Sequence, residues 1–437
     1  MTTPRPGRLP AAAKRFLMWD KSPAAFGITM PIPVPTAMGP DDARGLINAL
    51  MDTHETLRSR YTYGPTAAWE ILPASGGDVD DTRIDVRTVD ISEVAAAEFG
   101  DLIARETAVN EGRLGLESGR VVTAALCTRP AHGNILLLTV HHVACDAVAL
   151  WIVWGDAASY VSQWESGADD IALEPESTTT SEWATFLEEY SRTRLDELDY
   201  WFSTSDPEPS RISRPDTPEP VYIDAMIDGA LADRLFEDLP AAFDSTYTRV
   251  MLIAFGLAVE DVLGVPRPIQ VQKHGRYARL RPGTDLGRTV GWLSDDYPWL
   301  PATLAGSHAA RMRHAMDRYP QAPEDFLLLR WYNPDLTEKF SSFNNPKFYF
   351  NFVGELGGYV PTARSRDMAR LGTFDLAMLL GGYRQDGVQR VHYSVHSPAG
   401  GLGVDQANEI VRQWLSILET VETGIGSAHA AQTNPSR

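Results

Sequence analysis

Two adjacent histidines and an aspartate lie within six residues of each other and are the side chains of this chain best suited to catalysis. His141, His142 and Asp146 belong to the segment HHVACD at 141–146. A short apolar run precedes this segment and a longer one follows, so the sequence predicts a buried strand, a loop and then a helix. Histidine exchanges protons near neutral pH, and the first backbone N–H groups of a helix can bind developing negative charge. Together these groups indicate acyl transfer, with one histidine facing the substrate and Asp146 organising the loop.

Two other interpretations of this segment stay open at this point. In the first, the histidines are half-buried residues satisfied by hydrogen bonds, although such clusters are rarely purely structural. In the second, they bind a metal. Adjacent residues of a strand point to opposite faces, which hinders His141 and His142 from sharing one ion, and the sequence has no second Cys or His cluster at metal-ligand spacing. We expect Cys145 to be a small packed residue rather than a nucleophile, because no activating base is predicted on its face.

The composition describes an acidic globular protein. The 437 residues carry a net charge of −19, with 43% hydrophobic and 22% charged residues. Nucleic acid and anionic membranes are not expected partners, because both need basic surfaces on the protein. The sequence has only two cysteines, no apolar leader and no apolar run long enough to cross a membrane. We therefore expect a cytoplasmic protein without a disulfide framework.

The length of the chain and a proline-rich stretch predict two domains. Residues 203–220 carry five prolines among polar residues, which is typical of a linker. We expect an N-terminal domain over 1–205, a linker over 206–220 and a C-terminal domain over 221–437. Both halves alternate strand-like and helix-like runs, so the predicted fold class is α/β or α+β.

Two features outside the hexapeptide carry further expectations. An amphipathic helix that begins near Pro40 has His54 on its apolar face, where a packed, hydrogen-bonded histidine is more common than a catalytic one. Four arginines form a candidate basic patch for an acidic carrier protein, although such a run more commonly lies on a solvated face. They are Arg276, Arg279, Arg281 and Arg288.

Several motifs resemble those of the condensation domains of nonribosomal peptide synthetases, which belong to the chloramphenicol acetyltransferase-like superfamily. Residues 141–146 resemble the HHxxxDG signature, and HETLR at 54–58 resembles the family's H-x-x-L-R segment. KHGR at 273–276 and GRTVGWL at 287–293 resemble a block most typical of the epimerization branch, and FNFVG at 350–354 resembles FNYLG. Their order and spacing agree across nearly the whole chain, so the sequence is closest in motifs to the condensation/epimerization branch.

The resemblance implies two acetyltransferase-like lobes in a V-shaped pseudo-dimer, with a central tunnel that phosphopantetheine arms of carrier proteins enter. It matches His142 to the catalytic histidine of the family. It makes Asp146 a structural residue bonded to an arginine, for which Arg58 is our candidate. Ala147 would start the helix whose backbone N–H groups hold the oxyanion. The side chains that we expect in the tunnel are Gln272, His274, Trp292 and Asn351.

Two positions depart from the family pattern. Ala147 replaces the glycine after the aspartate, and its methyl group narrows the space there while leaving the backbone N–H in place. Gln272 stands where the epimerization branch carries a glutamate, and an amide does not exchange protons at ordinary pH. Epimerization needs two proton-transfer groups, so Gln272 favours bond formation, although Glu355 is an alternative second group.

We therefore predict a free-standing acyltransferase of nonribosomal peptide or hybrid natural-product biosynthesis. It would join a carrier-bound acyl or aminoacyl thioester to an amine or hydroxyl, forming an amide or an ester. No adenylation or carrier-protein motif is recognisable, so we expect a monomer that meets a carrier protein in trans. We expect no cofactor or metal of its own, and an acceptor that is either a small molecule or carrier-bound. A stand-alone epimerase and a non-catalytic docking module that recruits a partner enzyme are the alternatives.

Overall fold

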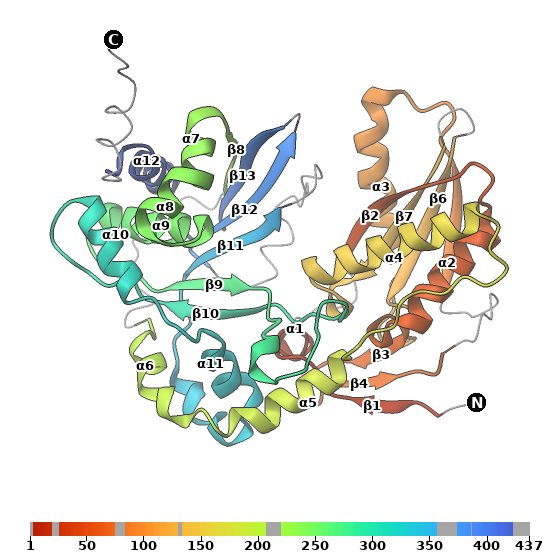
Figure 1. The fold of residues 1–437 in the computed structure, drawn as a ribbon, viewed down its shortest axis with the longest axis horizontal. Coiled ribbons are helices and arrows are strands. Elements are labelled where there is room, and N and C mark those ends of the chain that lie inside the picture. The colour runs from red at the N-terminus through yellow and green to blue at the C-terminus, as the bar shows by residue number, and fades with distance from the viewer. Residues whose placement is uncertain are drawn as a thin grey trace, which may run out of the picture. The chain divides into compact units, whose positions relative to one another are not determined.

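The chain forms two compact units that each combine helices with open sheets (Figure 1). The computed structural model describes residues 3–19, 26–74, 84–129, 133–206, 220–355, 374–385 and 387–422. The first unit contains residues 1–192 and 274–295, and the second contains residues 193–273 and 296–437. The mixture of helices and open sheets confirms the predicted α/β class, whereas the V-shaped arrangement and its tunnel stay predictions.

The boundary between the units differs from the single linker that the sequence predicts. The predicted linker at 206–220 lies, apart from its two end residues, outside the described residues. The chain enters the second unit at Thr193, and residues 274–295 return to the first unit. The returning stretch is held there because Arg276 and Arg288 pair with carboxylates of α4 and its cap, within the first unit. Composition identifies proline-rich stretches but does not report such long-range ion pairs.

The central sheet of the first unit has the strand order β2-β7-β6-β5. β7 pairs antiparallel with both β2 and β6, whereas β5 is parallel to β6. β6 and β7 are buried along almost their whole length because their sequences are nearly continuous apolar runs. A smaller antiparallel sheet has the order β1-β4-β3. The strands are Arg5–Gly7 (β1), Gly27–Val34 (β2), Ser59–Thr62 (β3), Ala68–Ile71 (β4), Asp85–Asp90 (β5), Val122–Thr128 (β6) and Asn134–His141 (β7).

Helices cover both faces of the central sheet. Leu102 of α3 packs against Ala125 and Leu137 on one face. Helices α2 and α4 contact each other and lie over the opposite face (Figure 1). α4 begins where the sequence predicts, because Asp146 caps it by accepting a hydrogen bond from the N–H of Ala149. The helices are Ala11–Trp19 (α1), Pro40–Thr53 (α2), Phe99–Glu111 (α3), Ala147–Glu165 (α4) and Thr180–Ser191 (α5).

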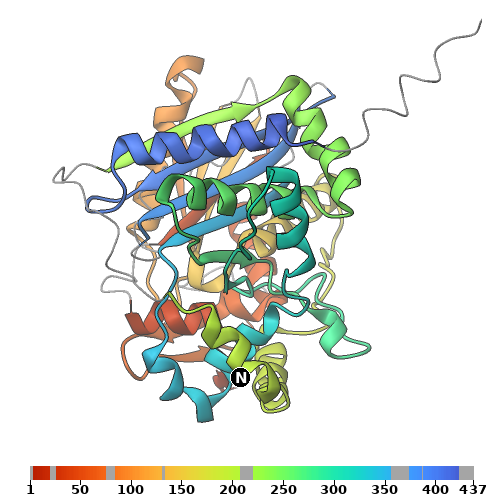
Figure 2. The same ribbon diagram turned by 90° about the vertical axis from the view of Figure 1, so that its left-hand side faces the viewer.

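The second unit is built on a six-stranded mixed sheet with the order β10-β9-β11-β12-β13-β8. α9 and α12 lie side by side against this sheet (Figure 2). The strands are Val221–Ile227 (β8), Ile269–Lys273 (β9), Asp295–Trp299 (β10), Phe348–Glu355 (β11), Leu376–Gln385 (β12) and Val388–Ser397 (β13). The helices are Leu198–Ser203 (α6), Gly229–Asp233 (α7), Leu239–Phe243 (α8), Tyr247–Leu263 (α9), His308–Asp317 (α10), Glu324–Leu327 (α11) and Val404–Thr420 (α12).

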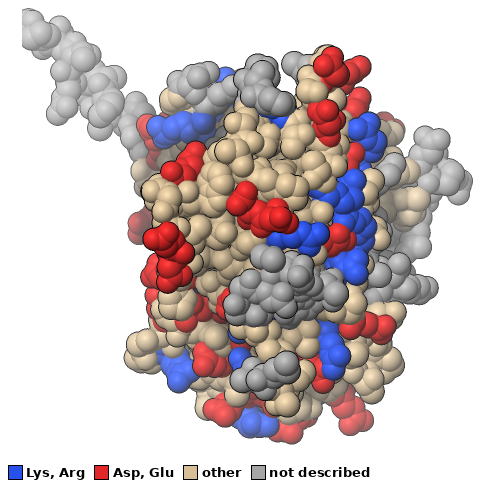
Figure 3. Space-filling view, turned by 90° about the vertical axis from the view of Figure 1, so that its right-hand side faces the viewer, with Lys and Arg blue, Asp and Glu red and all other residues tan. Residues whose placement is uncertain are grey.

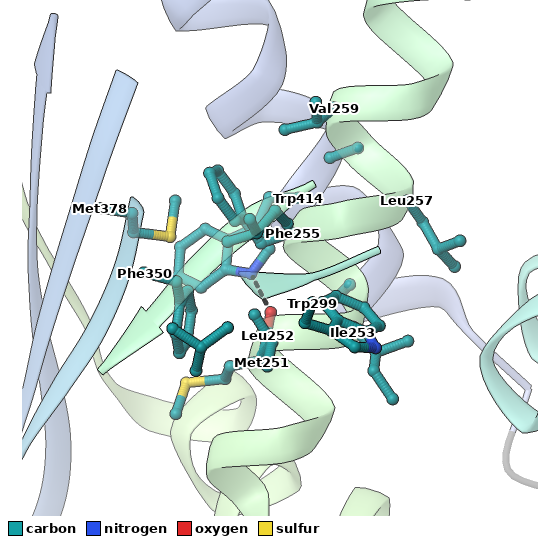
Figure 4. Packing of buried hydrophobic residues seen from close by; sticks show 14 of the residues in the cluster. Met251, Leu252, Ile253, Phe255, Leu257, Val259, Trp299, Phe350, Met378 and Trp414 are labelled. Carbon is teal, nitrogen blue, oxygen red and sulfur yellow. Dashed lines mark hydrogen bonds between the residues drawn. The ribbon is translucent and has the colours of Figure 1, made fainter. Parts of the chain in front are cut away.

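The core of the second unit forms around α9 (Figure 4). Residues 250–259 of this helix are all buried, because their sequence is apolar around the whole circumference. Phe255 faces Phe350 of the sheet with ring centroids 6.0 Å apart. The indole Nε1 of Trp414 in α12 donates a hydrogen bond to the carbonyl of Met251 at 3.1 Å. A buried hydrogen bond therefore fixes the two helices in addition to their apolar packing.

Charged side chains of both signs lie next to each other on the face shown in Figure 3. In the first unit, two carboxylates are each shared by two arginines. Glu106 pairs with Arg87 and Arg105, and Asp85 pairs with residues 113 and 120. Within the described part of the chain, no helix combines the length and apolar character needed to cross a membrane.

Candidate active site

The hexapeptide lies at a strand-to-helix junction, as the sequence predicts. β7 ends at His141, a single turn of 3₁₀ helix covers His142–Ala144, and α4 begins after Asp146. The N–H of His142 donates to the carbonyl of Phe26 at 2.7 Å, and the carbonyl of His142 accepts from the N–H of Cys145 at 3.2 Å. The backbone on both sides of the histidine is therefore fixed within the first unit.

The ring of His142 lies between two aromatic side chains. It stacks on Phe26 with centroids 4.7 Å apart, and its centroid is 4.0 Å from that of Trp292. The side chain as a whole is half-buried, but its Nδ1 atom is buried and has no hydrogen-bond partner among the described residues. Burial lowers the pKa of His142 from its ordinary value to about 4. The imidazole is therefore neutral at physiological pH and has a nitrogen lone pair available as an acceptor.

His141 has a different environment from its neighbour. Its side chain is fully buried, and Nδ1 accepts a hydrogen bond from the N–H of Val143 at 3.1 Å. This contact stabilises the 3₁₀ turn that carries His142. The geometry favours a positioning role for His141 over the catalytic role that the sequence suggests.

Asp146 holds the junction to the returning stretch 274–295. Its Oδ1 caps α4 through the N–H of Ala149 at 2.8 Å. Its Oδ2 accepts from the Arg276 guanidinium at 2.9 Å and from the N–H groups of Leu293 and Ser294 at 3.0 and 2.8 Å. The carboxylate is 2% exposed. Its lone pairs are used by these four donors, so Asp146 acts as a structural anchor rather than a proton carrier.

The predicted partner of Asp146 was wrong. Arg58 donates instead to the carbonyls of Met51 and Asp52, both at 3.0 Å, at the end of α2. The last carbonyls of a helix lack intrahelical partners, and a nearby arginine satisfies them readily. Arg276 takes the role that the resemblance assigned to an arginine. Its place in the KHGR motif was the available signal, but the sequence alone did not favour it over Arg58.

Glycine at position 275 lets the returning stretch pass close to residue 293. Gly275 has a φ of +68°, and a Cβ atom there would lie 1.6 Å from the carbonyl oxygen of Leu293. Only glycine fits such a close approach in a left-handed conformation. The glycine of KHGR therefore helps to place Arg276 next to the Asp146 carboxylate.

The four predicted tunnel residues divide between the two units. Trp292 is buried and contacts the His142 ring, as described above, while His274 is exposed and accepts a hydrogen bond from the N–H of Arg276 at 3.0 Å. Gln272 and Asn351 belong to the neighbouring strands β9 and β11 of the second unit. Gln272 accepts a hydrogen bond from the hydroxyl of Tyr349. Their predicted role in a tunnel stays a prediction.

Ala147 is the first residue of α4 and is half-buried. Helix geometry leaves its N–H and that of Val148 without intrahelical acceptors. These donors follow the His142 turn directly in the sequence. They are therefore candidates to bind an oxyanion, with the helix dipole favouring negative charge at this end.

Cys145 is packed inside the unit, as the sequence predicts. It is fully buried, and its Sγ lies 3.6 Å from the carbonyl oxygen of His141. Burial raises the pKa of the Cys145 thiol well above its ordinary range. A thiol in this state is not a nucleophile.

The four arginines proposed as a basic patch do not form a free cationic surface. Arg276 is bound by Asp146, and Arg288 pairs with Asp156 at 2.8 Å. Arg279 and Arg281 lie over the rings of residues 277 and 186. Separately, the described residues contain no group of three His, Cys, Asp or Glu side chains arranged to hold a metal ion.

Comparison with known proteins identifies a matching family. The family model described as Condensation domain matches residues 32–303. A linear gramicidin synthase of Brevibacillus parabrevis is 27% identical over 331 residues, which cover 70% of this chain and 6% of that protein. The chain thus corresponds to a small part of this much longer relative.

Solved structures with the same fold extend over almost the whole chain. The epimerization domain from the third module of tyrocidine synthetase B has a TM-score of 0.74 at 19% identity, covering 96% of this chain and 97% of that one. The X-domain from teicoplanin biosynthesis has a TM-score of 0.67 at 16% identity, covering 96% of each chain. At these identities the likeness shows a shared fold.

Proposed function

Because the chain belongs to the condensation-domain family, we propose that it is an acyltransferase that joins a carrier-bound acyl or aminoacyl thioester to an amine or a hydroxyl. In this proposal the donor arrives on the phosphopantetheine arm of a separate carrier protein, and the product is an amide or an ester. The observation that carries the proposal is the neutral His142 ring, which lies between Phe26 and Trp292 on a turn that Asp146 anchors.

The proposed reaction needs one proton acceptor and one oxyanion site. As the acceptor nitrogen or oxygen bonds to the thioester carbon, its proton moves to the imidazole of His142. The carbonyl oxygen becomes an oxyanion, for which the N–H groups of Ala147 and Val148 are the candidate donors. Collapse of this intermediate breaks the C–S bond, and the departing sulfur takes the proton back from the imidazolium and leaves as a thiol.

The depressed pKa of His142 fits a particular kind of base. An imidazole with a pKa of about 4 is unprotonated at neutral pH, so it is always ready to accept a hydrogen bond. It is a weak base, however, and takes the proton only as the nucleophile loses electron density to the new bond. Such a base orients the acceptor in the ground state and accepts charge in the transition state.

Gln272 argues for bond formation over epimerization. Reversing the configuration of an α-carbon requires one group to remove the proton and another to return it on the opposite face. The amide of Gln272 does not exchange protons and is hydrogen-bonded to Tyr349. The side chain of Glu355, the other candidate for a second group, lies outside the described side chains.

The proposal is tested with acyl- and aminoacyl-pantetheine thioesters and a panel of amines and alcohols, with products identified by mass spectrometry. His142→Ala should reduce turnover by about 10²-fold or more, the range that general-base groups contribute. The matched control is His308→Ala, which removes a surface histidine paired with Asp261 in the second unit. Turnover that is equal in both variants would remove His142 from the mechanism. Binding of a carrier protein without turnover of any thioester would instead favour a docking module.

A further inference from the structure

His54 lies at the centre of a buried cluster of charges that the proposed reaction does not use. The residue follows α2 directly and its side chain is fully buried, as the sequence predicts. Its Nε2 lies 2.7 Å from Oδ2 of Asp156, and its Nδ1 lies 2.9 Å from Oε1 of Glu176. Both ring nitrogens face carboxylate oxygens, so both must donate, and this requires the charged imidazolium.

Arg288 completes the cluster and balances its charge. One NH2 atom of Arg288 lies 2.8 and 2.9 Å from the two carboxylate oxygens of Asp156. Two carboxylates, one imidazolium and one guanidinium sum to zero. Burial opposes the charged ring, but the hydrogen bonds and charges of Asp156 and Glu176 outweigh it and raise the pKa of His54 above its ordinary value. A neutral His54 would leave a buried excess of negative charge.

The cluster also holds the backbone that carries Trp292. Oε1 of Glu176 accepts a hydrogen bond from the N–H of Val290 at 2.8 Å. Arg288, two residues earlier, is fixed by the cluster itself. Trp292, two residues later, contacts the ring of His142 with centroids 4.0 Å apart. A chain of direct contacts therefore connects the cluster to the candidate catalytic side chain.

We propose that His54 is a positioning residue of the active site, which as an imidazolium clamps Asp156 and Glu176 and so holds residues 288–292 with Trp292 against the ring of His142. The catalytic meaning of this clamp rests on the proposed function, whereas the clamp itself can be measured without substrate. When His54 loses its proton, one ring nitrogen presents a lone pair to a carboxylate, and that contact becomes repulsive. The clamp is therefore closed at neutral and acidic pH and loosens as the pH rises.

Charged groups surround His54 from every element that packs around it. α4 supplies Asp156, and the segment before α5 supplies Glu174 and Glu176. The returning stretch supplies Arg288. The turn after α2 supplies Glu55 and Arg58, whose charges also act on Glu176 or respond to it. The titration expected of His54 is thus that of a ring held mainly by its two carboxylate contacts.

Fluorine NMR on the full chain labelled with 5-fluorotryptophan tests the clamp directly. Trp292→Phe identifies the resonance of residue 292. Between about pH 6 and about pH 9, this resonance should shift along one titration whose midpoint lies above the usual histidine value of about 6.5. The titration should vanish in His54→Gln and persist in His274→Gln, the matched control from the same returning stretch. A role limited to stability would lower Tm but leave the Trp292 resonance in place.

Glu176→Gln keeps the test decisive where His54→Gln does not fold. The amide oxygen of the new side chain still accepts from Val290, but one of the two charges that favour the imidazolium is gone. The midpoint seen at Trp292 should therefore fall in this variant. A Trp292 titration that survives in folded His54→Gln, or a midpoint unchanged in Glu176→Gln, would overturn the proposal. Loss of the titration in His54→Gln, together with undiminished turnover in His142→Ala, would instead keep the clamp and refute the proposed function.

Discussion

Replacing Asp146 with alanine should release the returning stretch from the candidate active site. Its carboxylate accepts four hydrogen bonds in a buried setting, from Ala149, Arg276, Leu293 and Ser294. Hydrogen bonds to charged groups contribute about 1.5–3 kcal/mol each, but contributions that share one acceptor are not additive. Removing one partner of a buried ion pair costs about 3–5 kcal/mol, because the remaining charge is left unpaired. We therefore expect Asp146→Ala to lower the free energy of unfolding by about 3–5 kcal/mol.

Urea unfolding measures this loss, and amide hydrogen exchange locates it. The N–H groups of Leu293 and Ser294 should lose protection in Asp146→Ala, because the carboxylate is their acceptor. The matched control is Glu70→Ala, which breaks an exposed pair with Arg60 in the same unit and should cost at most about 1 kcal/mol. A cost for Asp146→Ala as small as that of the control, with both amides still protected, would refute the anchoring role.

Three further predictions follow from the same geometry. Gly275→Ala should cost more than about 2 kcal/mol in urea unfolding, because its Cβ meets a backbone carbonyl, whereas Gly283→Ala, also at positive φ but in open space, should cost about 1 kcal/mol. Acyl transfer should persist on acidification until a midpoint near the pKa of His142, about 4, and a midpoint at the usual histidine value would show a solvated ring. The unfolded chain takes up this proton at higher pH than the folded one, so stability should fall as the pH drops toward 4, less steeply in His142→Gln. Because burial raises the pKa of Cys127 to about 11 and that of Cys145 well above its ordinary range, neither thiol should react with a disulfide reagent until the chain is denatured.

Local sequence patterns predicted the elements that position the hexapeptide. The apolar runs on either side of 141–146 form β7 and α4 because burial and helix capping are decided within a few neighbouring residues. Two strands of the second unit were not predicted. β10 contains two aspartates and a proline, and β12 contains two adjacent glycines, both of which local propensity disfavours in strands. Pairing with neighbouring strands overrides that preference.

Partners distant in the sequence were beyond the reach of local patterns. Arg276 lies 130 residues from Asp146, and nothing in its immediate neighbourhood distinguishes it from Arg58. The family resemblance placed Trp292 among the functional residues, but only the fold shows its contact with His142. Phe26 carried no sequence signal at all, since a single phenylalanine next to a strand is ordinary core. Ion pairs and ring contacts of this kind depend on tertiary structure, which residue periodicity does not encode.

The central claim is that His142 serves bond formation and not inversion at an α-carbon. The most direct test incubates the protein in deuterated water with an aminoacyl-phosphopantetheine carrier protein and an amine acceptor. Mass spectrometry then follows both the product and the recovered thioester. We predict an amide product without α-deuterium, a recovered thioester that is also undeuterated, and loss of the product in His142→Ala. An α-deuterated thioester without any amide product would contradict the account.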